Sequence, residues 1–303
     1  MVDSSGAGHK ARPARVLAVI AVAAVAAGCT GRQGAARPPS ARPEQSPAPQ
    51  VGLRVAVVGA LNVHVPGAIV THRSLPDALN QSLVLVAASS PAVGAVPAAA
   101  AANPSTHYVI VGASAAEQRL TNLAGAVLRD DQAARLGGIA AGLSAEEQSS
   151  RSPSVAWVGP RDPALVAGFV AGVRRVASRT TILRAWSPPL PASCKESALG
   201  AIAHGASAVM ATGGLCAAAA VDGAHERNVP ALALSDFELP DLVAASIARD
   251  AVRGVFYGRE DLIFGARTGA IGVRRLDPLF SDAVATRTRA IAQQLAGGGS
   301  ATG

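Results

Sequence analysis

The segment "SVAWVGPRDPALVAGFVAGVRR" (Ser154–Arg175) contains the pattern that decides the fold. It begins with a nearly continuous apolar run, SVAWVGP, which ends in Gly and Pro and predicts a buried strand. The residues that follow, Asp162–Ala177, have the spacing of a helix. A buried strand followed at once by a helix is the repeating unit of a parallel sheet that helices cover on both faces.

The same alternation of strand and helix continues on both sides of this segment. Other apolar runs predict strands at Leu53–Gly59, Ser82–Ser89, His107–Ala113, Thr180–Trp186, Ala206–Gly214 and Val229–Asp236. Helical patterns occupy Pro91–Ala102, Asp130–Leu143, Glu196–His204 and Ala217–Glu226. This order predicts an α/β fold of parallel sheets with right-handed crossovers.

The composition limits the classes of partner. Half of the 303 residues are hydrophobic, but only 3% are aromatic, so few flat side chains are present to stack on bases. The formal net charge is +7, and much of it belongs to the first fifty residues, since residues 51–303 hold 21 basic and 18 acidic side chains. Without a basic stripe interleaved with aromatic residues, no nucleic-acid partner is expected.

The N-terminal segment has the features of an export signal. Lys10, Arg12 and Arg15 precede the uncharged apolar run Val16–Ala27, which is shorter than the roughly 20 residues that a membrane span needs. The run ends in a small-small-Cys step that resembles the bacterial lipobox, so Cys29 is expected to carry a lipid anchor. A plain secretory signal with an incidental cysteine is the alternative.

We therefore expect a signal peptide over residues 1–28 and a disordered Pro/Ala/Arg-rich tether over residues 29–50, outside the cytoplasm on a bacterial cell membrane. The tether segment has almost no aliphatic bulk to bury, and a chain of that composition stays extended. Such a tether would lift a folded domain off the membrane surface.

Small polar residues at strand ends are the candidate ligand contacts. Ligands of open parallel sheets bind outside the carboxyl ends of the strands, where backbone amides and helix N-termini approach them. The sequence places Ser89 and Ser90, Gly213 and Gly214, and Ser235 and Asp236 at such ends. Asp236 suits a polar ligand contact or a helix cap equally well.

The acidic pair Asp130 and Asp131 opens a predicted helix. Carboxylates favour the positive end of the helix dipole, so the pair is interpreted either as a cap or, for Asp131, as a ligand contact. No motif of a nucleotide-binding loop, a serine hydrolase or a zinc peptidase occurs, and the histidines lack metal-ligand spacing. We expect neither an enzyme nor a metal or other cofactor.

Two cysteines remain after Cys29 is assigned to lipid. Cys194 comes just before a predicted helix and Cys216 just after the next strand, which places both at the same edge of the sheet. Because export permits oxidation, a disulfide between them is predicted. Two separate buried thiols are the alternative.

Four longer segments share the motifs of one known family. Val127–Leu143 matches an acidic-Gln-x-x-x-Leu-x-Gly-x-x-Ala helix, and Ser154–Arg175 a strand-turn-helix with an internal Phe-x-x-Gly. Ala198–Asp236 matches a helix, a strand, a Gly-Gly loop, a helix and a strand, and Gly269–Gly298 a closing turn and an amphipathic helix. In this order they resemble the basic membrane protein family, the substrate-binding lipoproteins of ABC importers, many of which bind nucleosides.

The resemblance implies a class I periplasmic-binding-protein-like fold of two lobes, each a parallel sheet flanked by helices. Lobe 1 would hold residues 51–150 and 250–298, and lobe 2 residues 151–249. The family's cleft aspartate falls on Ser235, or on Asp236 after a shift of one residue, and the lysine of its next strand falls on Arg249. A monomer would bind a small polar ligand between the lobes and deliver it to an ABC permease.

The sequence departs from the family near its start. The ligand-contacting Asp-Asp-x-x-Phe-Asn motif is missing after Leu53–Gly59, and the roughly 20 residues before Ser82 leave no room for the usual extra β-α unit. The alternative function is therefore a degenerate binding-protein lipoprotein that serves as a surface sensor or as an interaction partner without transport.

Overall fold

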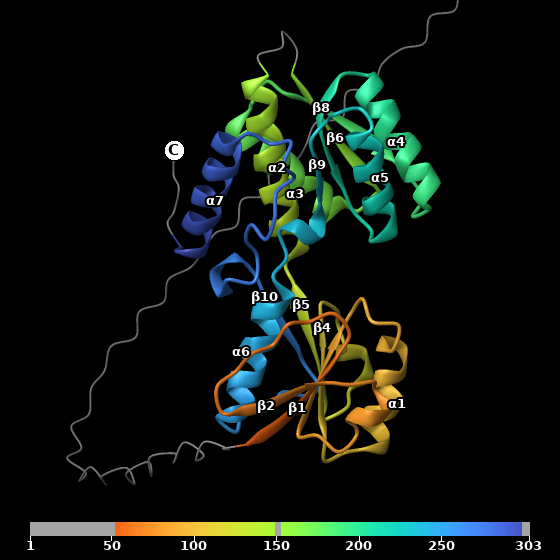
Figure 1. The fold of residues 1–303 in the computed structure, drawn as a ribbon, viewed down its shortest axis with the longest axis vertical. Helices are drawn as coiled ribbons and strands as arrows, with labels where there is room; N and C mark the ends of the chain where they lie inside the picture. The colour runs from red at the N-terminus through yellow and green to blue at the C-terminus, as the bar shows by residue number, and fades with distance from the viewer. Residues whose placement is uncertain (1–51, 149–152, 299–303) are drawn as a thin grey trace, which may run out of the picture. The chain divides into compact units, whose positions relative to one another are not determined.

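The computed structural model describes residues 52–148 and 153–298, and two parallel sheets form its framework (Figure 1). The first sheet has the strand order β10-β5-β4-β3-β1-β2, and the second has the order β7-β6-β8-β9. Every strand pair in both sheets is parallel. The predicted α/β class with parallel sheets flanked by helices is confirmed.

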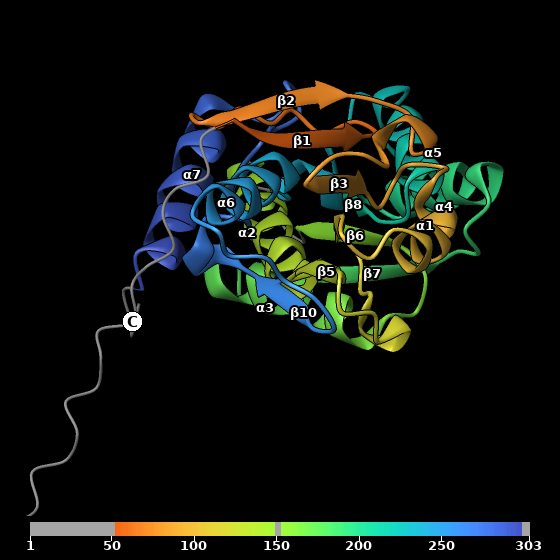
Figure 2. The same ribbon diagram turned by 90° about the horizontal axis from the view of Figure 1, so that it is seen from below.

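The first sheet is built mainly from the N-terminal half of the chain. Its strands are β1 (Leu53–Val58), β2 (Ala68–His72), β3 (Leu83–Ala87), β4 (His107–Val111), β5 (Leu123–Leu128) and β10 (Asp261–Phe264). The central strands are almost wholly buried, because helices cover both faces. The edge strand β2 is largely accessible and lies beside β1, as Figure 2 shows from below.

The helices α1 (Val96–Ala102) and α6 (Pro240–Val252) lie on opposite faces of the first sheet (Figure 1). Val96 and Ala100 of α1 belong to the same buried cluster as Val84 and Tyr108 of the sheet. On the opposite face, α6 packs against β1, β3 and β4. Successive side chains of a strand point to opposite faces of the sheet, so the aliphatic side chains on each face pack against a helix.

The second sheet consists of β6 (Ser154–Gly159), β7 (Thr181–Trp186), β8 (Ala206–Ala211) and β9 (Ala231–Ala233). Its helices are α2 (Asp130–Glu147), α3 (Pro163–Val176), α4 (Pro191–Ala203), α5 (Leu215–His225) and α7 (Asp282–Ala296). The pair α4 and α5 lies on one face, and α2 and α3 lie on the other (Figure 1). On the α3 face, the rings of Trp157 and Phe169 lie 5.5 Å apart.

Glycines allow α2 and α3 to approach closely. A β-carbon at Gly138 of α2 would lie 2.1 Å from the carbonyl oxygen of Phe169, and one at Gly172 of α3 would lie 2.0 Å from the carbonyl oxygen of Arg135. These distances are far below van der Waals contact, so only glycine fits at either position. The Gly-x-x-x-Gly spacing of Gly168 and Gly172 in the quoted segment thus fixes how the two helices pack.

The structure also contains elements that the sequence patterns did not predict. They are β2, β5, β10 and α6, of which β2 lies in the interval before Ser82. The interval therefore contains the strand of a β-α unit, β2. It lacks the helix of such a unit, because residues 59–67, which join β1 to β2, form no helix. A short edge strand with one exposed face lacks the continuous apolar run that marks a buried strand.

The expected lobe boundaries stay a prediction. The strands of residues 51–150 are in the first sheet and those of residues 151–249 in the second. Some helices pack on the other side of these bounds. Helix α2, which belongs to residues 51–150, packs against α7 and against β8 of the second sheet, whereas α6, which begins within residues 151–249, packs on the first sheet. The signal peptide, Cys29 and the tether lie outside the described residues. Within the described ranges, no helix has both the length and the hydropathy needed to cross a bilayer.

Candidate ligand-binding pocket

The turn between β8 and α5 forms one wall of the candidate pocket. Gly213 and Gly214 follow β8 with φ values of 96° and 52°, a region in which side chains other than glycine are strained. Gly214 is the N-cap residue of α5, and the amide of Ala218 donates to its carbonyl oxygen over 3.1 Å. The two glycines therefore leave backbone exposed at the carboxyl end of a central strand.

The neighbouring strand β9 ends at the same edge. It runs into the short 3-10 helix η4 (Leu234–Asp236), in which Ser235 is exposed and Asp236 is half-buried. The Asp236 carboxylate accepts a hydrogen bond from the amide of Ala233 over 2.8 Å. Asp236 thus holds the end of β9 with one oxygen while its side chain lines the pocket.

A segment near the C-terminus closes the other side. Asp277 Oδ2 lies 2.6 Å from His225 Nε2 and accepts the amide of Ala231 over 2.8 Å, while its Oδ1 accepts the amide of Leu279 over 2.9 Å. The Asp277 side chain is only 4% exposed. One carboxylate therefore joins the end of α5, the start of β9 and the segment before α7.

Together these walls enclose a pocket of about 590 Å³. Its lining includes small residues from α5 and β9 and the polar or charged side chains Asp222, His225, Ser235, Asp236, Glu238, Arg275 and Asp277. A volume of this size suits a small-molecule ligand. None of the described residues that line it is Phe, Tyr or Trp.

Burial shapes the electrostatics of the pocket. Burial raises the pKa of Asp236, and the hydrogen bond from Ala233 and the positive charge of Arg275 partly oppose this. Burial also raises the pKa of Glu238 to about 7, with the negative charge of Asp130 adding to the effect. The wall holds four carboxyl groups against one arginine and one histidine, so it favours a ligand that donates hydrogen bonds or carries positive charge.

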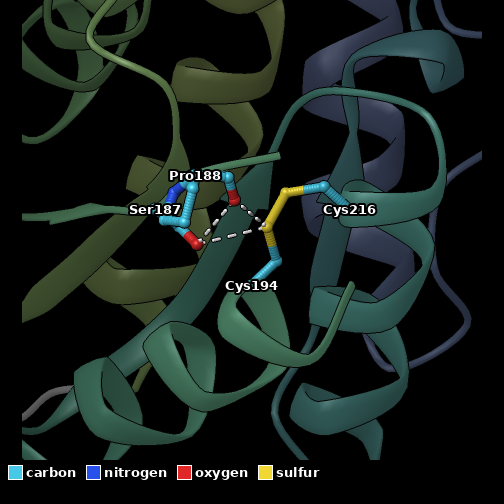
Figure 3. Close-up of a disulfide and its surroundings, with 4 residues drawn as sticks. All are labelled: Ser187, Pro188, Cys194 and Cys216. Atoms are coloured by element: carbon cyan, nitrogen blue, oxygen red, sulfur yellow. Dashed lines mark hydrogen bonds between the residues drawn. A yellow bond between two sulfur atoms is a disulfide. The ribbon is translucent and has the colours of Figure 1, made fainter. Parts of the chain in front are cut away.

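The predicted disulfide is present beside this pocket (Figure 3). It joins Cys194 in the first turn of α4 to Cys216 in the first turn of α5, and both residues are buried. The Cys194 sulfur also lies 3.3 Å from the hydroxyl of Ser187 and 3.3 Å from the carbonyl oxygen of Pro188. The bridge therefore holds the start of α5, and with it the Gly213–Gly214 turn, against the rest of the second sheet.

Four of the eight candidate ligand residues lie together in this pocket, namely Gly213, Gly214, Ser235 and Asp236. Ser89 and Ser90 lie in the turn after β3, where Ser89 is exposed and buried Ser90 accepts the amide of Ala92 over 3.3 Å.

Asp131 and Arg249 line other cavities. Asp131 forms a two-fold ion pair with Arg129, whose hydrogen bonds lower the pKa of the Asp131 carboxyl. Arg249 is exposed in α6, beside Pro66 and Arg253, and not on the strand that the family resemblance implied. The chain between β9 and β10 forms a helix there because its apolar residues recur at helical spacing.

Sequence reasoning missed the polar residues that the tertiary structure adds. His225, Arg275 and Asp277 follow no predicted strand end, and Glu238 lies two residues beyond the predicted strand Val229–Asp236; the folded chain brings all four to the pocket. A second missed group lies at the carboxyl ends of β6 and β7, where Arg161 lies over the ring of Trp186 at 5.5 Å in a cavity of about 390 Å³. Trp186 was identifiable, as one of two tryptophans in the chain, by its place at a strand end.

The described residues contain no group of three or more His, Cys, Asp or Glu side chains arranged to hold a metal ion. The arrangement offers backbone and carboxylate hydrogen-bonding groups around a cavity, which is the chemistry of reversible binding.

Several solved structures have a fold similar to this one. An ABC transporter solute-binding protein from Conexibacter woesei is similar, with a TM-score of 0.57 and 20% identity over 82% of this chain and 97% of that one. A second, from Aeropyrum pernix, has a TM-score of 0.54 and 16% identity over 81% and 92% of the chains. A transcriptional activator of the comK gene from Bacillus halodurans has a TM-score of 0.56 and 12% identity over 80% and 97%.

These identities establish likeness of fold, and the fold is shared by transport and regulatory proteins. No protein-family model matches the sequence, and no curated protein matches it. The function must therefore be argued from the site.

Proposed function

We propose that this protein is a lipid-anchored extracytoplasmic solute-binding protein of an ABC importer and not an enzyme. The observation that supports this best is the pocket of about 590 Å³ at the carboxyl ends of β8 and β9, where four of the residues expected to contact ligand lie together. The fold likeness to solute-binding proteins agrees with the proposal.

The ligand is a small polar solute rich in hydrogen-bond donors. Asp222 and Asp236 supply carboxylate acceptors to hydroxyl or amino groups, and the exposed hydroxyl of Ser235 adds a donor and an acceptor. Nucleosides belong to this class through their ribose hydroxyls. The wall offers no Phe, Tyr or Trp among the described residues on which a base could stack, so we expect hydroxyl and amino groups to dominate recognition.

The lipid anchor would keep the binding domain beside its permease. In this proposal the thiol of Cys29 is acylated, residues 29–50 act as a tether, and a monomer delivers its ligand to the membrane. Labelling of cells with an alkyne fatty acid tests the anchor. Label on the wild-type chain and none on a Cys29→Ser variant is expected, and label on the variant would place the anchor elsewhere.

A thermal-shift screen of nucleosides, sugars and amino acids tests the binding function. A ligand should raise the melting temperature, and isothermal titration should then give its affinity. Ser235→Ala and Asp236→Asn should weaken binding, by about tenfold where a charged hydrogen bond is lost. Asp282→Asn is the matched control, because Asp282 is exposed in the first turn of α7 and does not line the pocket.

Capture of partners from membranes separates the proposal from its alternative. Recovery of an ABC permease supports the transport role. The alternative, a surface sensor or interaction partner that has lost transport, would instead yield a kinase or a cell-wall enzyme, and no small solute in the screen would then bind.

A further inference from the structure

A second cavity, of about 380 Å³, has the opposite electrostatic character to the pocket above. It lies between α2, the turn that follows β10 and the end of α7. Its charged lining residues are Arg129, Arg135 and Arg267, and none of the described residues that line it is Asp or Glu. A cavity with three guanidinium groups and no acidic wall is suited to an anion.

The charges of two of these arginines are uncompensated. Arg129 is paired with Asp131 through two hydrogen bonds of 2.8 Å. Arg135 and Arg267 form no ion pair with any carboxylate of the described residues, and the Nε of Arg135 is buried without a hydrogen-bond partner. A guanidinium group without a carboxylate partner can hold an incoming anion without first breaking an ion pair.

Neighbouring groups are arranged to hold the cavity open and to add a donor. The side-chain oxygen of Gln132 accepts the amide of Ala266 over 2.8 Å, which fixes the turn after β10 on α2 and leaves the Gln132 NH₂ group free to donate. The hydroxyl of Thr268 holds the same turn through the amide and the carbonyl of Gly265. The turn that carries Arg267 is therefore fixed on α2, which carries Arg135.

We propose that this cavity binds a small organic phosphate or a similar tetrahedral oxyanion on a short organic body. The guanidinium groups of Arg135 and Arg267 hold the oxyanion, since their planar forks match two of its oxygens at a time. Ile263, which is 57% exposed, and Leu295 give an apolar wall for the organic part. The cavity is larger than a bare phosphate needs and lies in the range of small-ligand sites.

This site does not depend on the proposed solute pocket. The two share no lining residue, and one is acidic where the other is basic. Failure of the solute screen would leave this proposal standing, and failure of the test below would leave the solute pocket standing.

Isothermal titration of the full chain at low ionic strength is the test, with sn-glycerol 3-phosphate, inorganic phosphate and glycerol as probes. Glycerol 3-phosphate should bind, inorganic phosphate should bind more weakly, and any binding of glycerol, a polyol of the class proposed for the solute pocket, should be unaffected by Arg267→Gln. Arg267→Gln and Arg135→Gln should each weaken glycerol 3-phosphate binding about tenfold or more. Arg287→Gln, an equal change of charge at an exposed residue of α7 outside the cavity, should leave it unchanged.

Arg267 is exposed, so its variant should fold even if the Arg135 variant does not. The proposal is overturned if neither phosphate probe binds the wild-type chain, or if Arg287→Gln weakens binding as much as Arg267→Gln. Equal affinity for inorganic phosphate and glycerol 3-phosphate would overturn the assignment of an organic body.

Discussion

The carboxylate of Asp277 lies 2.6 Å from the imidazole Nε2 of His225, a residue 52 positions earlier in the chain. The same carboxylate accepts the backbone amide of buried Ala231. Asp277→Ala should lower the free energy of unfolding by about 2–3 kcal/mol, because the Ala231 amide loses its acceptor in a buried setting.

Urea denaturation is the measurement for this variant. Asp222→Ala is the control, since Asp222 is exposed on α5 and forms no side-chain hydrogen bond in the described structure, and its effect should stay within about 0.5 kcal/mol. Equal effects of the two substitutions would show that Asp277 does not hold the edge of β9.

The Cys194–Cys216 disulfide should stabilise the second sheet. Its two residues are 22 positions apart, and closing a loop of that length in the unfolded chain is worth about 3 kcal/mol. The double variant Cys194→Ser/Cys216→Ser should lose about that much stability. Reduction of the wild-type protein should produce a similar loss and should not affect the double variant, whereas a loss on reduction in both would point to another cause.

Gly172 of α3 should not tolerate a methyl group. Gly172→Ala places a β-carbon 2.0 Å from the Arg135 carbonyl oxygen, so α2 and α3 must move apart at a cost of about 2 kcal/mol or more.

Gly200→Ala is the matched control for Gly172→Ala. It makes the same substitution within α4, where a β-carbon would meet nothing within 4 Å. It should stabilise the protein by about 0.5–1 kcal/mol through helix propensity. Thermal melting of both variants gives the comparison, and a stabilised Gly172→Ala would refute the close approach of the two helices.

Glu238 should make stability depend on pH between about 4.5 and 7. Its pKa is raised to about 7 in the folded protein, so the folded state binds a proton that the unfolded state releases near its ordinary pKa of 4.5. The contribution of protonated Glu238 is fully present below about pH 4.5 and is lost as the pH rises through about 7. The loss between these limits is on the order of 3 kcal/mol at most.

Glu238→Gln should remove this part of the pH dependence, because glutamine stays neutral. Urea denaturation at pH 5 and pH 8 measures it. Stability of the wild-type protein should fall from pH 5 to pH 8 by more than that of the variant. Parallel pH profiles for the two proteins would show that Glu238 is ionised in the folded state at neutral pH.

The candidate site was predictable only in part, and the two halves of the pocket show why. Gly213, Gly214, Ser235 and Asp236 could be found because each directly follows a buried strand, and strand ends are visible as the points where apolar runs stop. His225 and Asp277 occupy a helix end and a loop, positions at which a polar residue signals nothing by itself. Their role appears when the chain brings them within 2.6 Å.

The sequence by itself determined the α/β class and most of the buried strands, and it favoured the pairing of Cys194 with Cys216 that the structure contains. These depend on local periodicity and on the rule that successive units of a parallel sheet place corresponding ends at one edge. The tertiary structure alone decided that β10 from the C-terminal part joins β5, that α2 packs on α3 through glycine, and that Arg135 and Arg267 share a cavity without a carboxylate. These features depend on contacts between residues far apart in the chain, which no local pattern encodes.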